Sequence, residues 1–336
     1  MEFRLFIPEI TLSAMKNGSY NYGIGKTTNQ HAKAAWILAC PLLESLNATL
    51  SRCAGTKCTI DHLTEVPSGS ISRAFVAATG ERKWFVKLNE IRLLDMFEAE
   101  ADGLYALAKC PAIRVPQVIG TGSAGRQAYL ILEHLELFPM ERHNARACTS
   151  AGRALVDVHR IIGSRFGWTR DNYIGHTPQS NHLRSDWADF FVRERLLPQL
   201  DIARKNGHSG SLIDNGERLA NRAHAFFSDH RAEASLLHGD LWNGNAALDL
   251  QGRFVLYDPA VYFGDRETDL AMSELFGGFP PAFYAAYREA WPLSTGYPQR
   301  RMLYNLYHVL NHCNLFGGGY RQQAEHMIGA LLAEIG

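Results

Sequence analysis

The chain has 336 residues, 46% of them hydrophobic and 20% charged, and its 34 basic side chains balance its 34 acidic ones. Such a composition is that of an ordinary globular protein large enough for two lobes. The zero formal charge argues against a nucleic-acid partner, and the absence of any apolar run near about 18 residues argues against a membrane span. Six cysteines without a C-x-x-C pair predict free thiols in a reducing compartment, the cytoplasm.

Residues 1–32 differ from the rest of the chain because they are polar, contain glycine and show no clear periodicity. We expect an extension outside the folded domain, either disordered or explained by an alternative start near Met15. The segment Gly23–Thr28, GIGKTT, looks like a phosphate-binding loop, but Tyr20 stands where the first glycine of that pattern belongs. No apolar strand precedes it, so we do not assign a phosphate site here.

The first folded half, residues 33–135, is predicted to be rich in strands. A helix is expected over 34–46, followed by two strands in 71–88 that meet at a turn with Gly80. A second helix is expected over 90–110. Prolines and glycines between 111 and 125 predict a loop, and the apolar run from Gln127 predicts a strand that ends in a polar connector.

The second half, residues 136–336, is predicted to be mainly helical, with amphipathic stretches at 151–162, 186–203 and 321–335. One β-hairpin is expected over 245–258, with Gln251-Gly252 at its turn. A β-rich N-terminal lobe, a connector and a helical lobe that contains a catalytic hairpin predict an α+β, two-lobed, protein-kinase-like fold.

The stretch SLLHGDLWNGNAALD contains polar residues among apolar neighbours, at a spacing that indicates phosphoryl transfer. Asp240 and Asn245 are five positions apart, as in the kinase pattern H-R-D-x-x-x-x-N, and Asp258 follows at the end of an apolar strand. Phosphoryl transfer needs a carboxylate that takes the proton of the acceptor hydroxyl, and oxygen ligands that hold Mg²⁺ against the phosphates. Asp240 fits the first role, and Asn245 and Asp258 fit the second.

Lys87 lies late in the second strand of the predicted hairpin, as the phosphate-binding lysine of kinases does. Its neighbours Val86 and Leu88 are apolar, so its ammonium group should need a partner. Glu100 in the following helix is the best candidate and Glu98 is the second, because helical phase alone does not decide between them.

Two weaker signals belong to the kinase pattern, and a third spacing is unrelated to it. The stretch VPSGSIS offers a turn for the ATP phosphates through Gly69 and Ser70, although kinases have three glycines there. In the connector, the backbone of Glu133, His134 and Leu135 would face the adenine edge. His308 and His312, beside Cys313, have the spacing of zinc ligands on a helix, but we favour packing and hydrogen bonding for them because no further ligand set is evident.

The strings LLHGDLWNGN, YDPAVYFGDRETDLAMSELFGGFP, FGWTRDNYIGHTPQSN and LYHVLNHCNLFGGGY resemble the fructosamine kinase (ketosamine 3-kinase) family. The resemblance runs from about Ala34 to the C-terminus. It implies a protein-kinase-like fold related to aminoglycoside and choline kinases. It also implies phosphorylation of a sugar hydroxyl on free or protein-linked ketosamines, with ATP and Mg²⁺, as a repair of glycated amines.

By the same resemblance Asp240 would be the base, Asn245 and Asp258 the metal ligands and Lys87 the phosphate-binding lysine. Asp269 would brace the catalytic loop from a helix start, with His238 as further structural support. Some family members carry a cysteine in the strand of the glycine loop that is linked to redox control; the stretch SGSISRAF has none. The short distance from Asp258 to the GDRETD string leaves little room for a long activation loop.

Substrate contacts are less clearly indicated. Trp242 could stack on a sugar ring or simply pack the catalytic loop. Arg266 and Glu267 could reach polar groups of the substrate or form an internal ion pair. Two rival functions remain open from the sequence: a kinase for an aminoglycoside or an amino alcohol, and a nucleotide-binding scaffold without catalysis.

Overall fold

The computed structural model describes residues 40–67, 71–140 and 145–336, so the predicted extension 1–32 lies outside the described residues. The described chain forms two compact units. The first contains the residues up to Ala101 together with Pro116–Leu135, and the second contains Asp102–Val115 together with Glu136–Gly336. This division differs from the expected one at residues 102–115, because Ala106, Leu107 and Cys110 pack in a hydrophobic cluster of the second unit.

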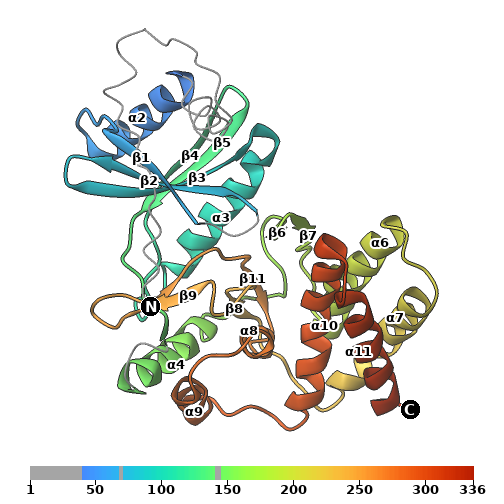
Figure 1. Ribbon diagram of the computed structural model, residues 1–336. Coiled ribbons are helices and arrows are strands. Elements are labelled where there is room, and N and C mark those ends of the chain that lie inside the picture. Colours follow the sequence, from blue (N-terminus) through green and yellow to red (C-terminus); the bar gives the residue numbers. More distant parts are fainter. Residues whose placement is uncertain (1–39, 68–70, 141–144) are drawn as a thin grey trace, which may run out of the picture. The chain divides into compact units, whose positions relative to one another are not determined.

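The first unit is built on one antiparallel sheet with the order β1-β2-β3-β5-β4 (Figure 1). The predicted hairpin is confirmed by the pairing of β2 and β3, and Gly80 at its turn has a φ of 60° that suits glycine. The strands are β1 (His62–Val66), β2 (Arg73–Thr79), β3 (Arg82–Glu90), β4 (Val118–Ala124) and β5 (Gln127–Glu133).

Strand β4 lies where the sequence predicted a loop, and that prediction was wrong. Its glycines are used for close packing. A Cβ atom on Gly120 would lie 2.8 Å from the Thr49 side chain, and one on Gly122 would lie 2.5 Å from the Tyr129 hydroxyl. Thr49 belongs to helix α2 (Cys40–Ala54), which extends to Ala54 where the sequence predicted an end near Leu46. The Tyr129 hydroxyl hydrogen-bonds Thr49 at 2.9 Å and so ties α2 to the sheet.

Helix α3 (Leu94–Leu107) follows β3 after a short 3-10 turn, Ile91–Leu93, which confirms the predicted helix except at its two ends. Its buried side chains include Met96, Phe97 and Leu104. The residues from Asp102 onward belong to the second unit, where the Trp168 indole nitrogen donates to Asp102 at 2.6 Å.

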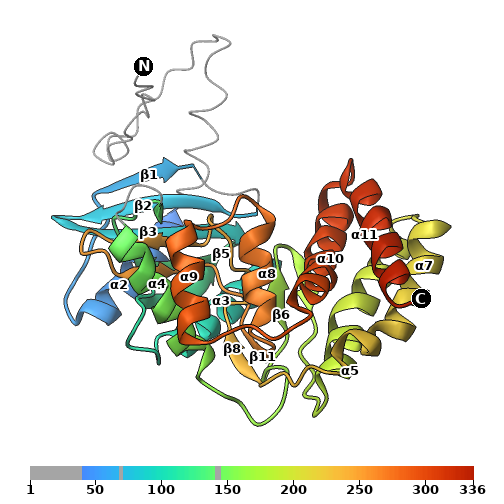
Figure 2. The same cartoon turned by 90° about the horizontal axis from the view of Figure 1, so that it is seen from below.

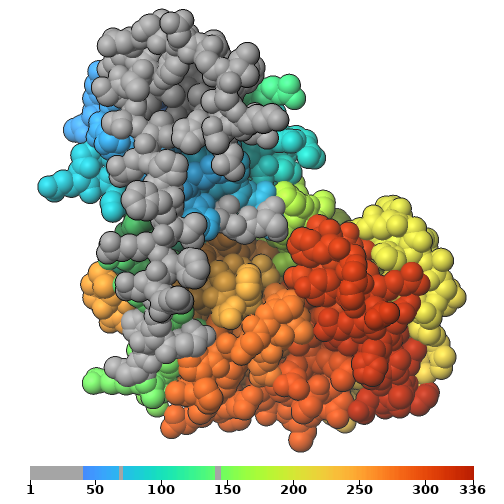
Figure 3. Space-filling view, in the orientation of Figure 1, coloured from blue at the N-terminus to red at the C-terminus, as the bar shows by residue number. Residues whose placement is uncertain are grey.

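The second unit is mainly helical, as predicted. Helices α7, α10 and α11 lie side by side at its surface (Figures 2 and 3), and α4 packs against α9, where a Cβ on Gly152 would meet the Phe283 carbonyl oxygen at 2.2 Å. The helices are α4 (Ala145–His159), α5 (Trp187–Phe191), the π-helix Val192–Leu196, α6 (Leu197–Lys205), α7 (Ser211–Arg222), the 3-10 helix Ala223–Phe227, α8 (Glu267–Leu275), α9 (Pro281–Ala290), α10 (Tyr297–Phe316) and α11 (Tyr320–Glu334).

Three short antiparallel strand pairs lie among these helices. The predicted hairpin is confirmed as β9 (Ala246–Leu248) paired with β10 (Phe254–Leu256). The pairs β6 (Asn172–Ile174) with β7 (Thr177–Gln179), and β8 (Ser235–Leu237) with β11 (Tyr262–Gly264), were not predicted. In the described residues no helix is both long and apolar enough to cross a bilayer.

Candidate active site

The catalytic-loop motif lies between β8 and β9 of the second unit. Gly239 has a φ of 81°, and a Cβ atom there would lie 2.0 Å from the Ala260 carbonyl oxygen. Both facts exclude a larger residue, because L side chains avoid this region and the space is taken by backbone. The glycine between His238 and Asp240 therefore lets the loop pass directly beside the segment that follows Asp258.

Three hydrogen bonds join the motif to that segment. The Tyr257 N–H donates to the Asn245 carbonyl at 3.1 Å, the Ala260 N–H donates to the His238 carbonyl at 2.9 Å, and His238 Nε2 donates to the Tyr257 carbonyl at 3.0 Å. His238 Nδ1 accepts from the Asp240 N–H at 3.2 Å, which fixes the tautomer with the proton on Nε2. The structure therefore brings Asp240, Asn245 and the Asp258 backbone to one place.

Asp240 is partly exposed and is oriented by Asn245. The Asn245 amide nitrogen donates to the backbone oxygen of Asp240 at 2.9 Å and to its Oδ2 at 3.0 Å. Burial raises the pKa of Asp240 to about 7, and the negative charges of Asp258 and Asp269 add to this while the Asn245 hydrogen bond opposes it. A carboxylate whose pKa lies near neutrality suits a general base.

Asp258 has a left-handed backbone, with a φ of 56°, and within residues 40–67, 71–140 and 145–336 no other non-glycine residue has a positive φ. Such a conformation costs free energy, and Asp and Asn tolerate it better than most residues. Strained residues concentrate at functional sites, where the surrounding structure holds them in place. The conformation therefore marks Asp258 independently of the sequence motif.

Asp269, near the start of α8, anchors the catalytic loop through its buried carboxylate. It accepts from the backbone N–H of His238 at 2.7 Å, from that of Gly239 at 2.9 Å, and from His159 Nε2 at 3.2 Å. Burial alone would raise the pKa of this carboxyl, but His159 and His238 hold it below its usual value. The bracing geometry that the family resemblance implied is present, and His159 is a partner that sequence reasoning missed.

Replacing Asp269 with asparagine should lower the free energy of unfolding by about 3–5 kcal/mol, because an amide NH₂ group would face N–H donors in a buried site. Urea denaturation with an unchanged m-value measures this effect. Since the fold depresses the pKa of Asp269, its stabilisation is present above about pH 4 and is lost as the pH falls further. The matched control is Glu217→Gln, which removes a surface carboxylate paired with Arg204; an equal loss in both variants would contradict the bracing role.

In the first unit, Lys87 pairs with Glu100, the first of the two candidates. Its Nζ lies 2.8 Å from Glu100 Oε1, and the two side chains are only 11% and 12% exposed. Glu98 points to solvent instead. A buried ion pair of this kind holds both groups in one geometry, since separating them would leave a buried charge without compensation.

The structure describes only some of the other residues that the sequence predicts to bind ATP. Gly69 and Ser70 lie outside the described residues. Glu133 ends β5, where its N–H donates to the Gln117 carbonyl at 2.8 Å, and His134 and Leu135 follow it half-buried. The adenine-binding role of this connector stays a prediction.

Arg266 and Glu267 are committed to internal contacts, so the prediction that they contact substrate is corrected. Glu267 is 1% exposed, and Arg300 Nε donates to its Oε2 at 2.7 Å. Arg266 stacks on the Trp291 ring at 4.2 Å and donates to the Tyr287 hydroxyl at 3.1 Å.

The Arg266 contact continues toward the catalytic loop. The Tyr287 hydroxyl lies 2.8 Å from His159 Nδ1, and His159 Nε2 lies 3.2 Å from Asp269. Arg266 is thus linked through Tyr287 and His159 to the Asp269 carboxylate, which holds the catalytic loop. Its position is therefore a supporting one.

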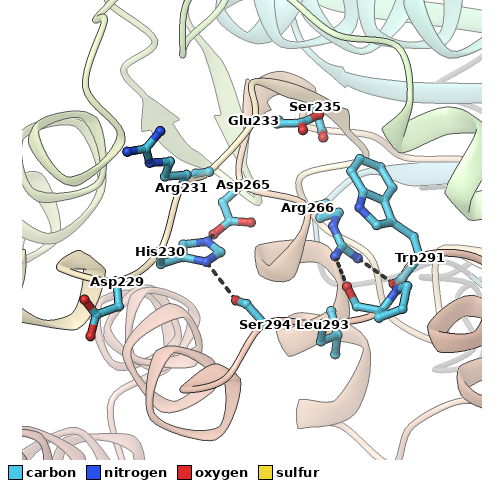
Figure 4. A pocket seen from close by; sticks show the side chains of 12 residues that line it. Asp229, His230, Arg231, Glu233, Ser235, Asp265, Arg266, Trp291, Leu293 and Ser294 are labelled. Atoms are coloured by element: carbon cyan, nitrogen blue, oxygen red, sulfur yellow. Dashed lines mark hydrogen bonds and ion pairs between the residues drawn. The ribbon is translucent and has the colours of Figure 1, made fainter.

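A separate cavity of about 260 Å³ opens beside Arg266 and Trp291 and does not include Asp240, Asn245 or Asp258 in its lining (Figure 4). His230 and Asp265 line this cavity, and together with Glu267 they bring three ligand-type atoms within 4.8 Å of one another. However, Arg300 already neutralises Glu267, and His230 Nε2 already bonds Asp265 at 2.6 Å. A metal ion would have to displace these buried contacts, so we read the cluster as structural.

His308 and His312 do not belong to any group of three ligand-type residues in the described part of the chain. Burial lowers the pKa of His308 to about 3, so this imidazole is neutral at physiological pH. His312 donates from Nδ1 to the His308 carbonyl oxygen at 2.8 Å.

The comparisons with known proteins place the chain. The family model described as fructosamine kinase matches residues 42–334. The chain belongs to the fructosamine kinase family. It is 44% identical over 286 residues to a probable ketoamine kinase of Synechocystis sp., covering 85% of this chain and 95% of that protein. It is 38% identical to a chloroplastic protein-ribulosamine 3-kinase of Oryza sativa subsp. japonica, covering 80% of this chain and 78% of that protein.

Solved structures agree with this membership. A crystal structure from Haemophilus somnus 129PT, provisionally named a fructosamine-3-kinase, is 31% identical with a TM-score of 0.78, covering 85% of this chain and 96% of that one. The aminoglycoside phosphotransferase APH(4)-Ia shares the fold at 17% identity and a TM-score of 0.56, covering 86% of this chain and 98% of that one. The two-lobed, protein-kinase-like α+β fold is therefore confirmed, and family membership implies ATP as the phosphoryl donor.

Proposed function

We propose that this chain is an ATP-dependent ketosamine 3-kinase that repairs glycated amines. The observation that carries the proposal is the set of hydrogen bonds that join the loop containing Asp240 to the segment containing Asp258. The chain that contains this arrangement is 44% identical to a probable ketoamine kinase. In the reaction the γ-phosphoryl group of ATP moves to a sugar hydroxyl and ADP leaves. Asp240 takes the hydroxyl proton.

The metal assignment rests on the donor chemistry of the second unit. The amide nitrogen of Asn245 is turned toward Asp240, which leaves its carbonyl oxygen as the ligating atom. Together with the Asp258 carboxylate this makes the hard oxygen set that Mg²⁺ prefers, so the residues fit the ion. Bound Mg²⁺ would offset the negative charge of the phosphates.

The nucleotide assignments use the first unit. The Lys87 ammonium, held by Glu100, would contact the phosphates, as the lysine of kinases does. The stretch with Gly69 and Ser70 would cover the phosphates, and the backbone of residues 133–135 would bind the adenine edge. This assigns nucleotide binding to residues 33–135 and acceptor chemistry to residues 136–336. A cytoplasmic location stays a prediction from cysteine content.

The deciding experiment measures phosphate transfer from Mg-ATP to fructose-, ribulose- and erythrulose-derived lysine adducts, free and on protein. An aminoglycoside and an amino alcohol serve as competing acceptors. We expect turnover on at least one ketosamine and none on the other two classes. Turnover only on an aminoglycoside or amino alcohol would show that the enzyme is a kinase for that compound. Mg-ATP binding without turnover on any acceptor would indicate a nucleotide-binding scaffold without catalysis.

A further inference from the structure

The string DNYIGHTPQSN forms a small hairpin whose side chains reach the segment that follows Asp258. Its strands β6 and β7 have three residues each, lie beside α10 (Figures 1 and 2), and pair so that Asn172 is opposite Gln179. Both of these side chains are buried, whereas Tyr173 and Pro178 between the buried positions are not. Directly opposite residues of a hairpin share one face, so the two amides act at the same place.

The two amides bind backbone carbonyls of the segment after Asp258. Asn172 Nδ2 donates to the Val261 carbonyl at 2.7 Å. Gln179 Nε2 donates to the Ala260 carbonyl at 3.3 Å and to Asn172 Oδ1 at 2.7 Å. Strand β11 starts at Tyr262, so both carbonyls lie before the strand, in buried residues. A buried carbonyl that loses its hydrogen bond costs free energy, and the hairpin therefore stabilises this path of the backbone.

The direction of these hydrogen bonds is set by Arg195, whose guanidinium group can only donate. Its Nη2 donates to Asn181 Oδ1 at 2.8 Å, and Asn181 Nδ2 in turn donates to Asn172 Oδ1 at 3.0 Å. Asn172 Oδ1 is thus an acceptor, which leaves its Nδ2 to face the Val261 carbonyl. The orientation of the Asn172 amide is fixed by its neighbours.

Gln179 is oriented in the same way from α10. The Tyr307 hydroxyl donates to Gln179 Oε1 at 2.7 Å, so Nε2 faces the Ala260 carbonyl. Arg195 is fully buried and lies over the Tyr262 ring at 4.0 Å, which anchors the far end of the network in the core. A buried network whose members are paired in this way is rigid.

The backbone of Asp258 needs support from its surroundings for two reasons. Its φ of 56° lies in a region that L residues rarely adopt. It also precedes Pro259, and the residue before a proline favours extended backbone with a negative φ. Such a conformation persists only where the surrounding structure holds it. The carbonyls that the hairpin binds belong to the second and third residues after Asp258.

Two further contacts hold the same segment within the second unit. A Cβ atom on Gly103 of α3 would lie 3.0 Å from the Pro259 side chain and 3.4 Å from that of Val261, so the helix packs closely on the segment. The Ala260 N–H donates to the His238 carbonyl, as described above. The hairpin amides add the hydrogen bonds that the carbonyls need.

We propose that Asn172 and Gln179 are positioning residues for Asp258. By holding the carbonyls of Ala260 and Val261, their amides keep the Asp258 backbone left-handed and its carboxylate in place for the metal ion. This inference rests on the metal role that the proposed function gives Asp258, and it adds the part of the chain that keeps this ligand in position.

The test measures Mn²⁺ binding in the presence of AMP-PNP, a non-hydrolysable ATP analogue, from the electron paramagnetic resonance signal of the free ion. Gln179→Met keeps the length of the side chain and removes the amide. We expect it to raise the Mn²⁺ dissociation constant about 10- to 100-fold, the effect typical of groups that orient a metal ligand. The Mg²⁺ concentration for half-maximal ketosamine phosphorylation should rise in parallel.

The matched control is Gln199→Met, the same change at an equally buried glutamine whose amide group hydrogen-bonds Asn311 and Asn314 of α10. It should lose comparable stability but keep the Mn²⁺ dissociation constant within about 3-fold of the wild-type value. A wild-type dissociation constant in Gln179→Met, or an equal rise in both variants, would overturn the inference.

Amide hydrogen exchange gives a readout that does not depend on the metal. The N–H groups of Tyr257 and Ala260 bond Asn245 and His238, so peptides that contain them report how firmly the segment is held. These peptides should exchange faster in Gln179→Met than in Gln199→Met, while peptides from α11 exchange alike in both. Equal exchange around Asp258 in the two variants would count against a positioning role.

A second pair of variants keeps the test decisive if Gln179→Met does not fold. Tyr307→Phe keeps the ring and removes only the hydroxyl that orients the Gln179 amide; it should raise the Mn²⁺ dissociation constant about 3- to 10-fold, as for one lost hydrogen bond. Its control is Tyr284→Phe, which removes a hydroxyl bonded to Ser273 and to the Phe279 N–H. Equal dissociation constants in the two tyrosine variants would overturn the inference.

The outcomes also separate this inference from the proposed function. A wild-type enzyme that phosphorylates ketosamines, together with normal Mn²⁺ binding in Gln179→Met, removes the inference and keeps the kinase. A wild-type protein that binds Mn²⁺ with AMP-PNP but phosphorylates no ketosamine removes the proposed function, and the comparison of Gln179→Met with Gln199→Met still decides the inference.

Discussion

Replacing Asp240 with alanine is expected to reduce kcat about 10²- to 10⁴-fold or more while the dissociation constant for Mg-ATP stays within about 3-fold of the wild-type value. In the proposed mechanism the Asp240 carboxylate accepts the proton of the attacking hydroxyl, whereas the metal contacts come from Asn245 and Asp258. Single-turnover phosphate transfer gives the rate, and calorimetric titration with Mg-ATP gives the affinity.

Asp214→Asn is the control for this prediction, because Asp214 is an exposed acid on α7 of the same unit. A second variant, Asp240→Asn, keeps the size of the side chain and an acceptor for the Asn245 amide but removes the base. If either Asp240 variant phosphorylated a ketosamine at the wild-type rate, Asp240 would not be the base.

Replacing Asp258 with asparagine should remove most turnover and raise the Mg²⁺ concentration for half-maximal activity at least about 10-fold, the size of effect expected when a metal ligand loses its charge. Asparagine tolerates the left-handed backbone of this position nearly as well as aspartate, so the change isolates the charge. A titration of activity with Mg²⁺ at fixed ATP measures the shift.

Asp258→Ala and Asp258→Gly complete this experiment. Alanine adds backbone strain at a φ of 56° and glycine removes it, so their difference in unfolding free energy, about 1–2 kcal/mol, reports the strain. Both should lose turnover to the same extent. A glycine variant with normal Mg²⁺ dependence would exclude Asp258 as a ligand and leave only the conformational role.

The arrangement around the catalytic loop was predictable because its signals are local and chemically specific. Asp240, Asn245 and Asp258 are polar residues at motif spacing among apolar neighbours. The hairpin of β9 and β10 brings the segments that contain Asn245 and Asp258 together. Lys87 was recognisable as a lysine between two buried side chains. The sequence narrowed its partner to two glutamates, and the structure pairs it with Glu100 because the side chain of Glu98 faces solvent.

Other parts of the fold have no sequence pattern from which their secondary structure or their partners could be predicted. Strand β4 contains glycines that resemble loop residues but serve contacts with Thr49 and Tyr129. Strands β8 and β11 are three residues each, too short to show an alternation of apolar and polar residues. Long-range partners were also hidden: Arg300 pairs with Glu267 from 33 positions away, and His159 reaches Asp269 from 110 positions away.

Only a short segment separates Asp258 from α8, the helix whose Asp269 braces the catalytic loop. Strand β11 pairs with β8 directly after this aspartate, and Asp265 already hydrogen-bonds the first turn of α8. Protein kinases place a long segment here whose phosphorylation switches activity on. The segment between Asp258 and α8 is therefore too short to hold a switch of this kind.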